Sequence, residues 1–104
     1  MKLRNYTPHP VTIGDTTYPS EGIARIEEDR REVMMSGGIT YASIRNGDIT
    51  GMPEDIEDGD FIVVSRPVSM AIGLPHVVCP DNFIRDGEGK ILRADGVAWF
   101  PNFD

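Results

Sequence analysis

The fold of this chain is decided by residues 61–79, FIVVSRPVSMAIGLPHVVC. The run opens with the most hydrophobic strand of the sequence and closes with a second short apolar stretch, residues 77–79. Between them, Pro67 suits the first turn of a helix and Gly73 suits its end. Strand, short helix and strand together form one crossover connection. The sequence therefore predicts a short helix over residues 67–73, between two strands of one sheet.

Turn signals recur every eight to twelve positions outside this unit, and the runs between them are short and rich in β-branched residues. This spacing is typical of an antiparallel, β-dominated domain. Hairpins are predicted at residues 14–15, 46–47 and 87–89, and two helical turns ending at Gly37 are expected over residues 28–36. The predicted fold class is α+β, mainly antiparallel β-sheet with one or two short helices, in a single small domain covering residues 1–104.

The composition limits the classes of partner. The formal net charge is −7 and the isoelectric point is near 4.7, so a duplex nucleic acid surface is disfavoured. No apolar run reaches the roughly 18 residues of a membrane span, and the start lacks the apolar region of a signal peptide. One cysteine, Cys79, fits a reducing cytosol and reads as a small core residue. We therefore expect a cytoplasmic protein without a membrane partner.

Arginine dominates the basic residues: eight of the ten are arginine and only two are lysine. A guanidinium grips phosphate or carboxylate with two parallel hydrogen bonds and also stacks on rings. The alternative is that most of these arginines pair with the abundant acidic residues. A small anionic ligand in an arginine pocket is compatible with the negative net charge.

A polar connection at residues 5–10, NYTPHP, cannot be helical, because Pro8 and Pro10 hold the residues before them extended. It presents an amide, a phenol, a hydroxyl and the imidazole of His9 in a row. Stiff polar loops on a small scaffold commonly carry binding chemistry. His9 is therefore a candidate ligand-binding residue.

Two further segments could bind an anion. Ser65 and Arg66 lie where the core strand meets the short helix, and the alternative is a capping serine beside a surface arginine. Residues 80–86, PDNFIRD, offer an amide, a stacking ring and a guanidinium, and the alternative is an Asx-turn with the ring in the core. Arginines in predicted strands could add charge to either pocket. The candidate residues of these segments are Ser65, Arg66, Asn82, Phe83, Arg85, Arg25 and Arg93.

Catalytic and metal-binding motifs are scarce in this sequence. It has no glycine-rich phosphate loop, no glycine-flanked serine nucleophile and no histidine at zinc-ligand spacing. The acidic run at residues 54–60, EDIEDGD, lacks the alternation of a calcium loop and is expected to form a solvated turn. We expect no cofactor, no metal and no enzymatic activity. A small hydrolase using His9 and Asp81 remains an alternative.

The opening at residues 3–13, LRNYTPHPVTI, is similar to the start of small phage and prophage proteins. Further blocks of that resemblance are residues 47–53, GDITGMP, residues 62–68, IVVSRPV, and residues 80–91, PDNFIRDGEGKI, in the same order. The chain departs from the family pattern at Tyr6, where leucine is more frequent, and in its aromatic tail, residues 99–104, WFPNFD. The resemblance covers about 90 residues.

The family that this resemblance suggests is the Thoeris anti-defence sponge proteins of phages. It implies a homo-oligomer in the cytoplasm of an infected cell that sequesters a cyclic ADP-ribose isomer, or a cyclic oligonucleotide, without degrading it. An alternative from another class is a protein-interaction module, a phage accessory inhibitor that docks through its acidic loop and aromatic tail. In either case the tail should pack on the domain or on a neighbouring subunit.

Overall fold

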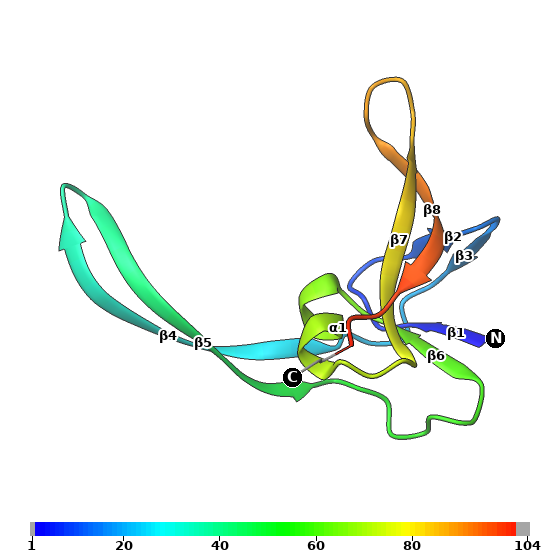
Figure 1. Cartoon of the computed structure of the whole chain (residues 1–104), viewed down its shortest axis with the longest axis horizontal. Helices are drawn as coiled ribbons and strands as arrows, with labels where there is room; N and C mark the ends of the chain where they lie inside the picture. Colours follow the sequence, from blue (N-terminus) through cyan, green and yellow to red (C-terminus); the bar gives the residue numbers. More distant parts are fainter. Residues whose placement is uncertain (1, 102–104) are drawn as a thin grey trace.

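The predicted crossover lies at the centre of the computed structural model, which describes residues 2–101 (Figure 1). Strand β6 (Asp60–Val63) leads into helix α1 (Arg66–Ile72), and the chain returns as β7 (Val77–Arg85), which pairs with β6 in parallel. The helix ends at Gly73, whose φ of 68° is left-handed and whose N–H donates to the carbonyl of Ser69 at 3.0 Å. The crossover and its helix are confirmed.

Four more strands extend this unit into a six-stranded sheet. They are β1 (Lys2–Asn5), β2 (Val11–Ile13), β3 (Thr16–Tyr18) and β8 (Ile91–Ala98), and the order is β1-β6-β7-β8-β2-β3. The hairpins β2–β3 and β7–β8 have the predicted turns. Three pairings, β1–β6, β6–β7 and β2–β8, are parallel, so the sheet is mixed. A bridge between Asn5 and Ser20 brings its two edges together, and the sheet curls towards a barrel.

The core is small and lies between this sheet and α1. Ile62, Val64 and Val77 are at most 1% exposed, and Tyr6, Ala24 and Val68 complete their cluster. Cys79 is buried as predicted, and this burial raises the pKa of its thiol. The broad prediction of a mostly β domain with a short helix is therefore confirmed for the described residues.

Two long strands form an arm that leaves the body (Figure 1). β4 (Arg25–Ser36) and β5 (Ile39–Thr50) pair only with each other, as a two-stranded antiparallel sheet. The helix expected over residues 28–36 is wrong, because that segment is β4. The hairpin expected at residues 46–47 is also wrong: Asn46 pairs with Glu28 inside the ladder, and the turn lies at residues 37–38.

The arm gives the molecule an open shape. Its extents are 49 × 39 × 29 Å, and its radius of gyration is 16.4 Å. A compact domain of this length has a radius of gyration of roughly 13 Å. The excess arises from the arm and from the distal part of the β7–β8 hairpin, which projects in another direction (Figure 1). Between residues 2 and 101, no helix has the length and apolar character needed to cross a membrane.

Candidate functional site

The first candidate site is a cavity of about 320 Å³ where the base of the arm meets α1, here called the arm-base cavity. Arg25 and Ser65, two of the predicted ligand-binding residues, contribute to its lining. The remaining lining is mainly apolar, with Asn46 and Glu28 as further polar groups; it comprises Pro8, Ile23, Ala24, Ile26, Glu28, Asn46, Pro67 and Val68. A mostly apolar cavity with a few polar groups is the usual form of a small-molecule site.

The predicted N-terminal loop positions one wall of this cavity rather than presenting a row of polar groups. The Asn5 side chain is buried, and its Nδ2 donates to the carbonyls of His9 at 2.8 Å and Tyr18 at 3.0 Å. Its Oδ1 accepts from the backbone N–H of Thr7 at 2.9 Å. Asn5 and Thr7 therefore hold the loop, Pro8 reaches the cavity, and the exposed His9 is not among the lining residues.

Ser65 and Arg66 have different surroundings at the start of α1: Ser65 lines the arm-base cavity and Arg66 does not. Ser65 occupies the N-cap position with extended backbone, but its side chain makes no capping hydrogen bond. Arg66 is exposed, so the alternative is correct about the surface arginine and about the position of Ser65 but not about its side chain. The guanidinium of Arg66 lies over the ring of Phe100, 5.0 Å from its centroid. The aromatic tail thus packs on its own domain at Phe100, while Trp99 is 41% exposed and residues 102–104 lie outside the described part of the chain.

A second cavity, of about 240 Å³, contains two other predicted residues and is here called the β7–β8 groove. Phe83 and Arg93 contribute to its lining, together with Pro10, Val11, Thr12, Pro80, Ile91, Leu92 and Ala94. Phe83 is 45% exposed, so the alternative that placed its ring in the core is wrong. The groove therefore offers an apolar surface on the sheet, on strands that are not part of the arm-base cavity.

Arg85 and Arg93 make contacts within the β7–β8 hairpin itself. Arg85 Nη1 donates to the carbonyl of Gly89 at 2.9 Å. Arg93 Nε donates to Asp95 Oδ1 at 2.8 Å, and this hydrogen bond raises the pKa of the guanidinium. Asn82 lies within β7 with a left-handed φ of 56°, and the residues on either side of it pair with β8, where an Asx-turn was the alternative. The eight predicted residues are thus not gathered into one pocket.

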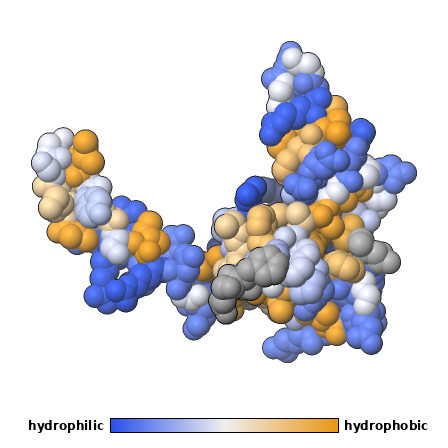
Figure 2. Space-filling model, in the orientation of Figure 1, coloured by the Kyte–Doolittle hydropathy of each residue, from blue (hydrophilic) through white to orange (hydrophobic). Residues whose placement is uncertain are grey.

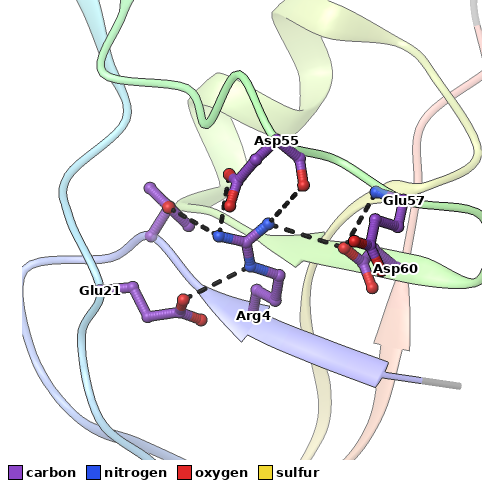
Figure 3. Close-up of polar contacts among 6 residues, drawn as sticks. Arg4, Glu21, Asp55, Glu57 and Asp60 are labelled. Atoms are coloured by element: carbon purple, nitrogen blue, oxygen red, sulfur yellow. Dashed lines mark hydrogen bonds and ion pairs between the residues drawn. The ribbon is translucent and has the colours of Figure 1, made fainter.

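Sequence reasoning missed a buried arginine with several polar partners, Arg4. It is 8% exposed, and its guanidinium lies among oxygens of Glu21, Asp55 and Asp60 (Figure 3). The Nη2 donates to Asp55 Oδ1 and to the phenol of Tyr6, both at 3.2 Å, and Nη1 lies 3.6 Å from Asp60 Oδ2. Alternation in the first strand is a usable signal, because it places Arg4 and Tyr6 on one face.

The Arg4 contacts explain part of the acidic run at residues 54–60. Burial acts to lower the pKa of Arg4, but the hydrogen bond and charge of Asp55 raise it overall. In return, the hydrogen bond from Arg4 lowers the pKa of Asp55. Residues 54–59 are exposed, as expected for a solvated turn, whereas Asp60 is buried. Asp55 and Asp60 in addition stabilise the start of the sheet through Arg4.

The metal and hydrolytic arrangements considered from the sequence are absent from the part of the chain that the structure describes. Residues 2–101 contain no group of three or more His, Cys, Asp and Glu side chains that could hold a metal ion. Within the same range, no hydrogen bond joins His9 to Asp81, the pair considered for hydrolysis. No protein-family model, curated protein or solved structure matches the chain. The resemblance to sponge proteins therefore stays a prediction.

Proposed function

We propose that this protein binds a small nucleotide-derived anion and holds it without converting it, with the arm-base cavity as its site. The observation that carries the proposal is the cavity itself: about 320 Å³ of mostly apolar space whose polar wall residues are Arg25, Asn46, Ser65 and the acidic Glu28. A guanidinium suits a phosphate group, and an amide and a hydroxyl suit the polar edge of a base or a ribose.

The apolar part of the lining suits the rest of such a ligand. Ile23, Ile26, Pro67 and Val68 offer a surface against which a base or a sugar ring would lose contact with water. The volume is near the lower end of the range for small-molecule pockets. The cavity would therefore enclose one nucleoside-sized part of the ligand, and the remainder would extend outward.

Retention without turnover is proposed because it requires less of the site. Catalysis needs an acid, a base or a nucleophile positioned at the reacting atom, whereas binding needs only the cation, polar groups and apolar walls just described. The resemblance to sponge proteins extends the proposal to cyclic ADP-ribose isomers or cyclic oligonucleotides, sequestered by a homo-oligomer in the cytoplasm of an infected cell.

Capture and release tests the proposal. The purified protein is mixed with cyclic ADP-ribose isomers and cyclic di- and trinucleotides, free ligand is removed, and the heated protein is chromatographed. An intact ligand should be released, and Arg25→Ala should weaken its binding about 10- to 100-fold, the usual worth of a hydrogen bond from a charged group.

The matched control for this experiment is Arg30→Ala, because Arg30 lies on the same strand but does not line the cavity. This variant should bind as tightly as the parent chain. A converted product would show an enzyme instead, and equal losses in the two variants would place the site elsewhere. Retention of none of these ligands would contradict the proposal.

A protein-interaction role through the tail is the second candidate function. The observation that favours it is Trp99, which is 41% exposed directly after β8. The acidic loop supports it less, since Asp55 and Asp60 face Arg4. Deletion of residues 99–104 should abolish partner binding if the tail docks, and should leave nucleotide binding intact if the arm-base cavity is the site.

A further inference from the structure

The end of the β4–β5 arm carries an uncovered apolar surface, here called the arm tip, residues 33–44. Six large apolar side chains within it are each more than half exposed, from 51% to 74%: Val33, Met34, Met35, Ile39, Tyr41 and Ile44. Figure 2 shows hydrophobic surface towards the end of the arm and mostly hydrophilic surface between it and the body, where the arm has its charged residues. Single exposed apolar residues are common, but a cluster of this size marks an interaction site.

The strand register places three of these side chains on one face. Met34 is paired with Tyr41, and Ser36 is paired with Ile39. Directly paired residues share a face, and so do residues two apart in one strand. Met34, Tyr41 and Ile39 therefore form one continuous apolar face at the arm tip, while Met35 points to the other side of the ribbon.

The same chain carries a surface of matching chemistry, the β7–β8 groove. Phe83, Ile91 and Leu92 line it and are 45%, 45% and 54% exposed. The groove lies on the body, whereas the arm tip lies at the far end of an extended ribbon directed away from it (Figure 1). A chain in this conformation cannot cover its own groove with its own arm tip.

Charge permits a second copy as the occupant. The chain as a whole carries −7, so two bodies repel each other, but the arm has four arginines against five carboxylates and is nearly neutral. The arm can thus approach a second body with little repulsion.

Size favours an exchange of arms. Met34, Ile39 and Tyr41 are each between 62% and 74% exposed, so each offers on the order of 100 Å² of apolar surface and the face on the order of 300 Å². A reciprocal exchange covers two such faces and the two groove surfaces beneath them, about 1,200 Å² in total, which reaches the lower end of stable interfaces.

We infer that the arm tip of one copy binds the β7–β8 groove of a second copy. The arm tip of the second copy binds the groove of the first, so that the two copies form a two-fold dimer. The face formed by Met34, Ile39 and Tyr41 covers Phe83, Ile91 and Leu92 of the neighbouring copy. The same contact made in one direction only would produce a ring or a filament. In each arrangement, the arm tip and the groove meet.

The first test is the oligomeric state of the purified chain, measured by sedimentation equilibrium from 1 to 100 µM, a range chosen to span ordinary dimer affinities. We expect a dimer that Met34→Glu dissociates with at least a tenfold weaker association. Met70→Glu is the matched control, because Met70 is 49% exposed on α1, away from both surfaces, and it should leave the dimer intact. A monomer at every concentration overturns the inference.

The second test identifies the surface to which the arm tip binds. Chains carrying Met34→Cys and Leu92→Cys are mixed and oxidised, while the native Cys79 is buried. A disulfide between the two different chains supports the inference. Disulfides only between two Met34→Cys chains would show that arm tips pair with each other, and no cross-link in a stable dimer would show another interface; both results overturn it.

Discussion

The six-stranded body and the β4–β5 arm use the same kinds of residue in opposite environments. Ile62 in β6 is fully buried and Ile39 in β5 is 74% exposed; Val63 is fully buried and Val33 is 60% exposed. In the body, strands from distant parts of the sequence and α1 exclude water from these side chains. In the arm, each strand has one neighbour; Ile26 and Ile49 at its base pack against the core, while the large apolar side chains of the arm tip are exposed. The comparison teaches that the body has a core of its own, whereas an isolated two-stranded ribbon is marginally stable and gains most from a partner.

The strongest way to test this comparison is to truncate matched isoleucines. Ile62→Ala should lower the free energy of unfolding by about 2–5 kcal/mol, because it removes buried methyl groups and leaves a cavity. Ile39→Ala should change it by less than about 0.5 kcal/mol in the dilute chain, since the side chain is exposed. Urea unfolding followed by circular dichroism at low micromolar concentration measures both. Similar losses in the two variants would show that the arm belongs to the cooperative core.

Glycines at the two ends of the arm give a smaller contrast. Gly51, just after β5, has φ of 83°, and a β-carbon there would overlap the carbonyl oxygen of Ile23. Gly51→Ala should therefore cost about 2 kcal/mol or more, from backbone strain and displacement together. Gly38 at the turn has φ of 78° and open space around it, so Gly38→Ala should cost about 1 kcal/mol. Equal effects in thermal unfolding would argue against a tightly fitted arm base.

The smallest expected effect concerns pH and the Arg4 contacts. The hydrogen bond from Arg4 lowers the pKa of Asp55 below its ordinary value of 3.8. A carboxyl group with a lowered folded-state pKa stabilises the fold above its unfolded-state pKa, and this contribution is lost as the pH falls through the folded-state pKa. Stability should therefore decrease below about pH 4, and Asp55→Asn should flatten that decrease slightly.

The control for the pH experiment is Asp48→Asn, which removes a carboxylate from the arm rather than from the neighbourhood of Arg4. Urea unfolding at intervals between pH 3 and pH 7 gives the two curves. The Asp48→Asn curve should keep the acid slope of the parent chain. If the free energy of unfolding of Asp55→Asn falls with decreasing pH as steeply as that of the parent chain, Asp55 does not contribute to the acid dependence of stability.

The crossover could be predicted from the sequence because its signals are local. A proline at the first helical turn, a glycine at the helix end and apolar strands on either side all act within a few residues. The β2–β3 and β7–β8 turns were predictable for the same reason. The arm was not, because its charged residues lack a clear period of two, and its pairing depends on a ladder running from Arg25 with Thr50 to Ser36 with Ile39. Asn46 has a high propensity for a turn, but it pairs with Glu28 within this ladder.

The candidate site was predicted only in part, because residue types are visible in the sequence but tertiary contacts are not. Arg25 and Ser65 lie 40 positions apart in sequence, and both line the arm-base cavity; Arg25 was predicted as an arginine on a strand and Ser65 from its place at the start of the helix. Arg93 and Arg85 were predicted for the same guanidinium group. In the structure, Arg93 donates a hydrogen bond to Asp95 and Arg85 donates one to the carbonyl of Gly89 in the turn. Which arginines face a cavity depends on tertiary contacts, and no single-sequence pattern encodes these. The Arg4 contacts needed a loop 51 residues away.

The central claim is that the body is complete in one chain and the arm tip is completed by a second. Amide hydrogen exchange at several protein concentrations tests it most directly, because exchange reports local opening along the chain. The account predicts that residues 33–44 and residues 83–92 become more protected as the concentration rises, while β6 stays equally protected throughout. Protection of the arm tip that does not change with concentration would contradict the account.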